Sequence, residues 1–334
     1  MINLTIIEYY LSNIGFDLKL PQIFKKTSLL TSSLIDILKI RAQTIQTARQ
    51  WFKLHNYIEI QGPIIIPAKK EWPNYLSTKI FNKTANLAQG LQPYDQALVE
   101  KFKKIYAFQP TFRLEKKQSQ NHLLEYWRIE VAQKTQLEEV MKSQENLIEY
   151  ICQDLSKIQN ISFLLKEKLK RLEKIKAPFN RITYERAIKT LQKKGIQIFW
   201  GQTIEKEAEI ALSHMFDKPF FITELPFNAQ TFFYESLKQK PQQTKSADLI
   251  APEGFTELSS SAQRIANKTE LGKKMQEIQV NPQDQKWYLQ LIETSNSPQS
   301  GFTLGFERLI QWMCKLKDIK KTTPYPRTNK CIYP

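Results

Sequence analysis

Two glycines and an arginine near the C-terminal end of the sequence have a spacing that suits the binding of a flat ring. The segment Gly301-Phe-Thr-Leu-Gly305 is expected to be a strand, and it runs directly into a helix that begins with Glu307 and Arg308. Because glycine has no side chain, the end of this strand leaves a bare backbone face on which a planar ring can lie. The guanidinium of Arg308 can stack over the other side of that ring. The segment therefore predicts a site for a flat ring system.

A second arginine lies in a charged segment in the first half of the chain. Arg113 follows Phe112 and precedes the polar loop 115–122. A guanidinium can hold two oxygen atoms at once, so it can cancel charge on a carboxylate and a phosphate that approach each other. Arg113 is therefore a candidate for the activation of a carboxylate by a nucleotide. The alternative is a charged hairpin held by cross-strand pairs.

An acid and a hydroxyl between these two segments could bind a metal ion. They occur in the run Glu257-Leu-Ser-Ser260. Carboxylate and hydroxyl oxygens suit Mg²⁺, which uses phosphate oxygens to complete its octahedron. Taken alone, however, this segment is better explained as a serine-rich turn.

Composition and charge restrict the class of protein. The 334 residues suffice for one large domain, and the three cysteines are too few and too scattered for a disulfide framework or a metal cluster. No run of apolar residues is long enough to span a membrane, and the start of the chain lacks a secretory pattern, so we expect a cytoplasmic protein. The net charge of +16 favours a polyanionic partner such as tRNA, although the Lys-rich composition typical of AT-rich genomes explains it equally well.

The remaining pattern predicts helices and strands that could position these residues. Strands that are mostly consecutive, with helices inserted between them, indicate an α+β fold with an antiparallel sheet. We expect a short N-terminal extension over 1–35 and one catalytic domain over 36–334. Helices are expected at 36–55, 134–175, 182–194, 205–215, 267–279 and 286–293, and strands at 57–60, 104–112, 124–132, 220–225, 246–250 and 256–264.

In this order, the segments resemble the motifs of class II aminoacyl-tRNA synthetases. The resemblance covers about 36–334 and is strongest to the asparaginyl and aspartyl subgroup, with the asparaginyl enzymes first. It implies an antiparallel sheet flanked by helices, an ATP-dependent, AMP-forming ligase reaction, and a homodimer formed through motif 1. Motif 1 corresponds to 49–63, motif 2 to 112–130 and motif 3 to 301–309, while 87–96 and 248–264 resemble segments of the subgroup.

The resemblance also implies a role for individual residues. Arg113 and Arg308 take the catalytic positions, with Tyr126 stacked on the face of the adenine opposite Arg308. Glu257 and Ser260 match the Mg²⁺ ligands of the subgroup. The implied ATP-binding residues are Arg113, Glu115, His122, Tyr126, Glu257, Gly305 and Arg308.

Four further residues correspond to the amino-acid pocket of the subgroup: Glu71, Gln92, Asp95 and Arg264. Arg264 matches the arginine that binds the side-chain oxygen of the substrate. Aspartate-specific members have a lysine at the position of Asp95, whereas an acid there can accept a hydrogen bond from an amide. A substrate carboxylate facing Asp95 would cost on the order of several kcal/mol, so the sequence favours asparagine over aspartate.

Several residues depart from the family pattern. Asn121 replaces an arginine that contacts the γ-phosphate, Thr303 replaces the middle glycine of motif 3, and Gly90 replaces a serine of the pocket. We also expect no counterpart of the family's anticodon-binding barrel, because residues 1–35 are too few to form one. These departures leave three hypotheses: an asparagine-tRNA-ligase-like enzyme, a tRNA-independent amide-forming enzyme of the asparagine synthetase-like kind, and a non-catalytic paralog that binds RNA or a partner protein.

Overall fold

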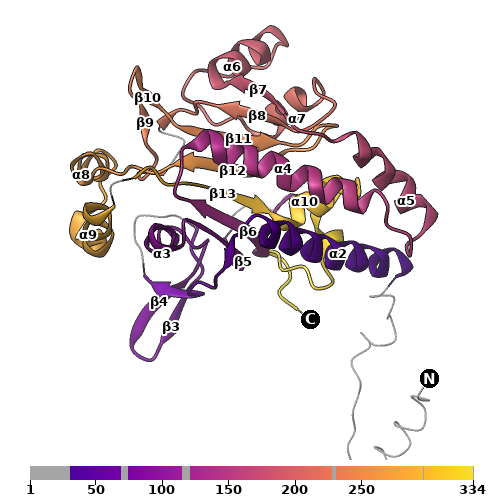
Figure 1. The fold of residues 1–334 in the computed structure, drawn as a ribbon, viewed down its shortest axis with the longest axis horizontal. Coiled ribbons are helices and arrows are strands. Elements are labelled where there is room, and N and C mark those ends of the chain that lie inside the picture. Colours follow the sequence, from indigo (N-terminus) through magenta and orange to yellow (C-terminus); the bar gives the residue numbers. More distant parts are fainter. Residues whose placement is uncertain (1–30, 69–73, 115–120, 228–230, 296, 334) are drawn as a thin grey trace, which may run out of the picture.

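A single large sheet forms the centre of the molecule (Figure 1). The computed structural model describes residues 31–68, 74–114, 121–227, 231–295 and 297–333. Within them the sheet has the strand order β1-β5-β6-β13-β12-β11-β8-β7, antiparallel except for the outermost pairs β1–β5 and β7–β8. The predicted α+β fold is thus confirmed. The strands are β1 Ile58–Glu59, β5 Lys104–Phe112, β6 Glu125–Gln133, β7 Asn180–Thr183, β8 Phe220–Thr223, β11 Ser246–Ile250, β12 Glu257–Gln263 and β13 Ser300–Gly305.

Two small sheets project from this centre, and the sequence pattern did not predict them. One has the order β2-β4-β3 and lies beside helix α3, and the other is the hairpin β9–β10. Their strands are short and carry mostly polar residues, so they lack a clear alternation. Their bounds are β2 Ile65–Pro67, β3 Ser77–Ile80, β4 Lys83–Leu87, α3 Tyr94–Phe102, β9 Ser236–Leu237 and β10 Lys240–Thr244.

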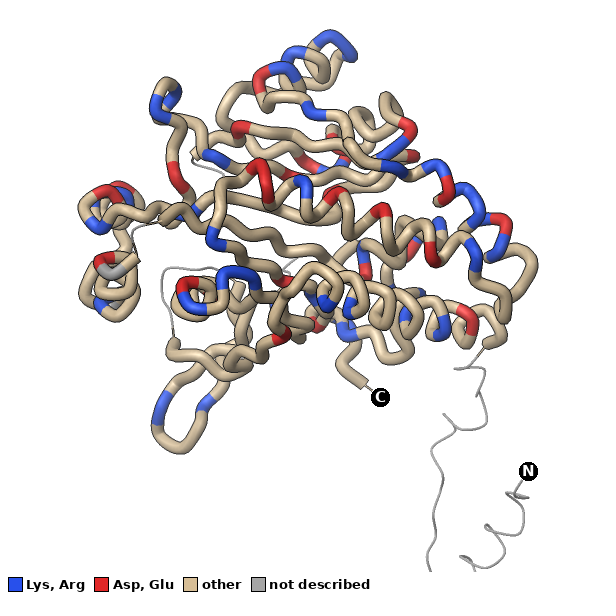
Figure 2. The backbone as a smooth tube through the Cα atoms, in the orientation of Figure 1, with Lys and Arg blue, Asp and Glu red and all other residues tan. Residues whose placement is uncertain are grey.

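The helices surround the sheet, and basic residues are spread over many of them (Figure 2). No helix among the described residues has the length and hydropathy required to cross a membrane. The first described helix begins four residues before the expected start, because the Thr31 hydroxyl caps it by accepting from the Leu34 N–H. The helices are α2 Ser32–Leu54, α4 Leu137–Leu155, α5 Phe163–Lys170, η2 Arg171–Lys174, α6 Tyr184–Lys193, α7 Lys206–Ser213, α8 Lys268–Glu277, η4 Pro282–Gln285, α9 Lys286–Thr294, α10 Phe306–Met313 and η5 Ile319–Thr322.

Two further expected helices were wrong in extent. The segment 134–175 is not one helix: α4 ends at Leu155, and α5 begins only after a turn. In that turn the Ser162 N–H donates to the Asp36 carboxylate of α2 at 2.8 Å, a tertiary contact that the local pattern does not reveal. Helix α6 starts at Tyr184 rather than at Ile182, since Thr183 ends strand β7 and caps the helix.

The two faces of the large sheet have different surroundings. Because side chains alternate along a strand, Ile129, Val131, Phe302 and Leu304 all point to one face, where α2, α4 and α10 cover them in the main apolar core. Neighbouring positions on the same strands point to the other face. That second face carries the polar residues of the site.

Candidate active site

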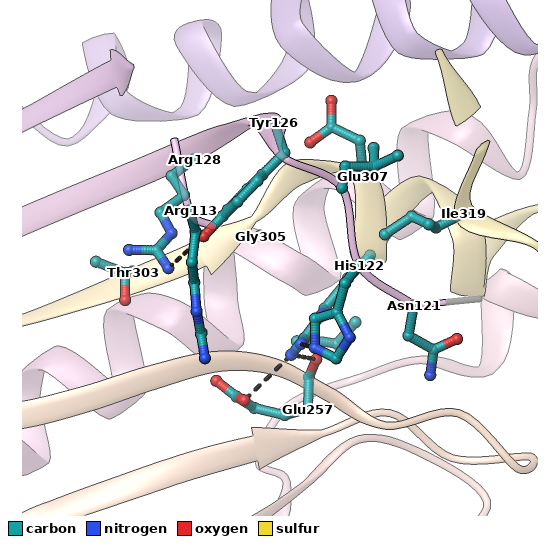
Figure 3. A pocket seen from close by; sticks show the side chains of 13 residues that line it. Arg113, Asn121, His122, Tyr126, Arg128, Glu257, Thr303, Gly305, Glu307 and Ile319 are labelled. Carbon is teal, nitrogen blue, oxygen red and sulfur yellow. Dashed lines mark hydrogen bonds and ion pairs between the residues drawn. The ribbon is translucent and has the colours of Figure 1, made fainter. Parts of the chain in front are cut away.

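A cavity on the second face brings motifs 2 and 3 together (Figure 3). Tyr126 and Arg128 come from strand β6, and Thr303 and Gly305 come from β13, which is paired with β6 so that Gly305 lies directly opposite Arg128. The cavity is also lined by Arg113, Asn121, His122, Leu123, Glu257, Leu258, Glu307, Arg308 and Ile319.

Arg308 connects three separate parts of the chain. Its Nη1 donates to the Glu257 carbonyl at 2.8 Å and to Glu257 Oε2 at 3.1 Å. Its Nη2 lies 3.3 Å from Nε2 of His122. The predicted residues of motif 2, of strand β12 and of motif 3 therefore lie around one cavity.

Glu307, the neighbour of Arg308, fixes motif 2 against the first described helix. One of its oxygens accepts from the Trp127 N–H at 2.9 Å, and the other lies 3.0 Å from Nη2 of Arg41 on α2. Glu307 and Arg41 are both largely buried. This contact holds the backbone next to Tyr126 in place.

Arg113 lies between two adjacent cavities. It follows β5, where its N–H donates to the Leu124 carbonyl at 2.9 Å, and it lines both the cavity of Arg308 and a second cavity that contains Asp248 and Ser260. Glu257 is the other charged residue common to both. A guanidinium at this junction can contact groups bound in either cavity.

The second cavity holds a group of acids, two of which the sequence analysis missed. Asp248 lies directly across the sheet from Ser260, and Glu209 accepts from the Glu257 N–H at 3.1 Å. Burial and the neighbouring Glu257 carboxylate raise the pKa of Asp248, and the same causes raise the pKa of Glu209 to about 7. Only the strand register and the fold reveal these neighbours.

The acids suit the Mg²⁺ that the resemblance implies. Asp248 Oδ1 is buried and has no hydrogen-bond partner among the described residues, and a cation beside Glu257 would relieve the repulsion between the two carboxylates. In the described part of the chain, no cluster of three or more acids, histidines or cysteines could hold a metal alone. These residues therefore suit a cation whose remaining ligands are phosphate oxygens.

Two of the four residues assigned to the amino-acid pocket, Asp95 and Arg264, form a buried charged group. Asp95 on α3 and Arg264 after β12 are only 4% and 3% exposed, and their charges interact. Burial raises the pKa of Asp95, although Arg264 acts in the opposite direction. The Arg264 guanidinium lies 5.0 Å from the ring centre of Tyr234. Gln92 is partly buried in the same segment as Asp95, whereas Glu71 and Glu115 lie outside the described residues.

Glu130 belongs to this group but was not predicted. It lies on β6 directly opposite Thr303, and its Oε2 accepts from the Leu91 N–H at 2.8 Å. Burial, with a smaller contribution from Asp95, raises the pKa of Glu130 to about 7. A Cβ on Gly90 would lie 2.8 Å from Glu130 Oε1, so the glycine at this position makes room for the carboxylate.

Thr303 and Asn121 both line the cavity that contains Arg308. The Thr303 side chain points inward, as its register with Ser260 and Glu130 requires, and so it occupies part of the face that a glycine would leave bare. Asn121 Nδ2 lies 3.5 Å from Oγ1 of Thr256.

The fold and the site define the class of protein. The family model for class II tRNA synthetases (D, K and N) matches residues 22–329. The chain belongs to this family and is an ATP-dependent ligase of the class II synthetase type. The resemblance seen in the sequence is thereby confirmed.

The similar proteins narrow the comparison to one branch of the family. The asparagine–tRNA ligase of Thermococcus gammatolerans is 34% identical over 301 residues, which are 89% of this chain and 70% of the relative. That of Desulforamulus reducens is 35% identical, with the same coverage of 89% and 70%. Asparaginyl-tRNA synthetase from Pyrococcus horikoshii complexed with asparaginyl-adenylate has a TM-score of 0.84 at 31% identity, covering 91% of this chain and 71% of that one. The Entamoeba histolytica enzyme has a TM-score of 0.83 at 25% identity, covering 90% and 69%.

Proposed function

We propose that this protein activates asparagine with ATP, forming asparaginyl-adenylate and pyrophosphate. One observation carries the choice of amino acid. Asp95 Oδ1 and Arg264 Nη1 are buried and have no hydrogen-bond partner within the described part of the chain. A side-chain amide supplies what both atoms need, since its NH₂ group can donate to Asp95 and its oxygen can accept from Arg264.

Aspartate fits this pair less well. Its second carboxylate oxygen would face the carboxylate of Asp95 in a site closed to water, where like charges repel strongly. The similar proteins support the same choice, because the relatives named above are asparagine–tRNA ligases and one solved structure contains asparaginyl-adenylate.

The geometry suits adenylate formation without a covalent enzyme intermediate. An α-carboxylate oxygen of asparagine attacks the α-phosphorus of ATP, the bond to the β-phosphate breaks, and pyrophosphate leaves. Arg113, at the junction of the two cavities, would neutralise both reacting groups, and Arg308 would stack on the adenine opposite Tyr126. Asp248, Glu257 and Ser260 would hold Mg²⁺, which supplies positive charge to the phosphates when bound. Catalysis would thus be electrostatic and positional.

The acceptor proposed for the activated asparagine is tRNA, as in the named relatives. We also propose a homodimer formed through the edge of the large sheet at β1. Ile58 on β1 is 46% exposed, and Leu54, at the end of α2 just before β1 in the chain, is 62% exposed. Light scattering of the full chain and of an Ile58→Lys variant tests the dimer, which the added charge is expected to dissociate.

Pyrophosphate exchange into ATP, with each of the twenty amino acids and without tRNA, tests the proposed activation. We expect exchange with asparagine, and its loss in an Arg113→Ala variant. Exchange with aspartate instead would refute the role of Asp95 and favour the amide-forming hypothesis, for which AMP release with ammonia is the next assay. If no amino acid supports exchange and ATP does not bind, the proposal is wrong and a binding-only paralog remains.

A further inference from the structure

Two side chains of strand β6 hold the backbone on either side of Gly90. Arg128 Nη1 donates to the Gln89 carbonyl at 2.7 Å, and Glu130 Oε2 accepts from the Leu91 N–H at 2.8 Å. Both side chains point to the same face, because they are two residues apart on a strand. Strand β6 therefore fixes the start of the segment that carries Gln92 and Asp95.

The same guanidinium also holds Tyr126. Arg128 Nη2 donates to the Tyr126 hydroxyl at 2.9 Å, and the guanidinium carbon lies 5.2 Å from the centre of the tyrosine ring (Figure 3). Arg128 and Tyr126 line the first cavity described above, together with Arg308. One planar group with several fixed donors is thus shared between that cavity and the Gln89 backbone.

Arg128 is a cation that the surrounding residues stabilise. Burial opposes its charge, but the neighbouring Tyr126, Glu130 and Glu257 outweigh this effect and raise the pKa of Arg128. Gly305, directly opposite on β13, has no side chain that could compete for the space. Hydrogen bonds from a charged donor are stronger than those between neutral groups. The hydrogen bonds of Arg128 to the Gln89 carbonyl and to the Tyr126 hydroxyl should therefore hold both groups firmly in place.

We propose that Arg128 is a positioning residue that couples the ring-stacking face of Tyr126 to the amino-acid segment 89–95, so that ATP and asparagine strengthen each other's binding. This inference rests on the proposed function. A nucleotide that stacks on Tyr126 keeps the hydroxyl beside Arg128, and Arg128 in turn keeps the Gln89 carbonyl and the segment behind it in place. By linkage, an amino acid bound to that segment favours the nucleotide by the same factor.

Kinetics of exchange, with ATP and asparagine varied against each other, test the coupling. Tyr126→Phe removes only the hydroxyl acceptor and is expected to raise the KM for ATP roughly 3- to 10-fold. Arg128→Met is expected to raise the KM for both substrates about 10-fold, with a smaller change in kcat. Arg128→Lys keeps a donor and should restore part of the loss. The double variant should be no worse than Arg128→Met, because both changes remove one shared contact.

An exposed arginine on α6 provides the matched control. Arg186→Met makes the same chemical change away from the cavities and should leave both KM values unaltered. The coupling is refuted if Arg128→Met leaves the KM for asparagine at the wild-type value, or if the two single changes add in the double variant. Thermal unfolding identifies any variant that fails to fold. If Arg128→Met does not fold, Tyr126→Phe alone tests the coupling. The quantity compared with the wild type is then the dependence of the KM for ATP on the asparagine concentration.

Failure of the proposed function is a separate outcome. It is recognised when the wild-type protein supports no exchange with any amino acid. Calorimetric titration with ATP and Mg²⁺, with and without asparagine, then tests the coupling directly. A gain in ATP affinity with asparagine that disappears in Arg128→Met supports the role of Arg128, and the absence of any gain in the wild-type protein overturns it.

Discussion

Replacing Glu130 by glutamine should stabilise the protein at alkaline pH. The carboxylate is 3% exposed, and burial raises its pKa from 4.5 to about 7. Because the folded state holds its proton more tightly than the unfolded state, the contribution of this group to stability is complete below pH 4.5. That contribution is lost as the pH rises through about 7.

The change in the free energy of unfolding follows from the change in the pKa of Glu130 on folding. A difference of about 2.5 between the two pKa values corresponds to about 3 kcal/mol above pH 7, at 1.36 kcal/mol for each pKa unit. In Glu130→Gln, the remaining side-chain oxygen can still accept from the Leu91 N–H, and the buried charge is gone. The variant should therefore gain up to about 3 kcal/mol over the wild type at pH 8, and much less at pH 5.

Urea unfolding followed by tryptophan fluorescence at pH 5 and pH 8 measures this difference. Glu138→Gln, on an exposed part of α4, is the control and should change little at either pH. A gain of equal size at both pH values would show that the charge of Glu130 is not its cause. A loss at pH 8 would refute the reasoning altogether.

Three further predictions concern activity. Asp95→Asn should reduce the preference for asparagine over aspartate by roughly 10- to 100-fold in kcat/KM, because the carboxylate that would face the substrate is lost. Lowering the pH through the raised pKa of Asp95 should reduce the preference in the same way. An unchanged preference would show that Asp95 does not face the side chain of the substrate. Gly90→Ala places a Cβ 2.8 Å from Glu130 Oε1 and should raise the KM for asparagine. The control Gly195→Ala adds its Cβ where no atom lies within 4 Å and should leave this KM unchanged. Equal effects of the two variants would contradict the idea that Gly90 makes room for the Glu130 carboxylate. Arg308→Met should reduce exchange at least about 100-fold, and normal ATP affinity in a fluorescence titration would argue against ring stacking.

The sequence predicted those parts of the fold and site that depend on local pattern. Strands β5 and β11 have the expected bounds, and α8 begins directly after Asn267, whose side chain caps it. One cavity is lined by Arg113, His122, Glu257 and Arg308. The sequence could predict this because the motifs that carry these residues have a recognisable order and spacing. These features are short-range, or were carried by the resemblance.

The residues that were missed depend on strand pairing. Asp248 becomes a neighbour of Ser260, and Glu130 a neighbour of Thr303, only through the register of the sheet. The strand pattern alone does not reveal what the Arg128 side chain contacts, and its partner Gln89 lies in a loop before α3. Sequence spacing contains no information on such pairs unless the strand order is known.

The strand order has a consequence for the synthesis of the chain. Strand β6 pairs with β13, so residues 133 and 300 are direct partners although a large part of the chain separates them. While a ribosome is still producing the middle of the protein, the inner edge of β6 has no partner and can pair with other chains. Once Ser300–Gly305 has emerged, it covers that edge and at the same time adds Thr303 and Gly305 to the lining of the cavity. If the cavity binds ATP as proposed, a nascent chain cannot bind ATP before this step, and ATP binding then shows that β13 has paired with β6.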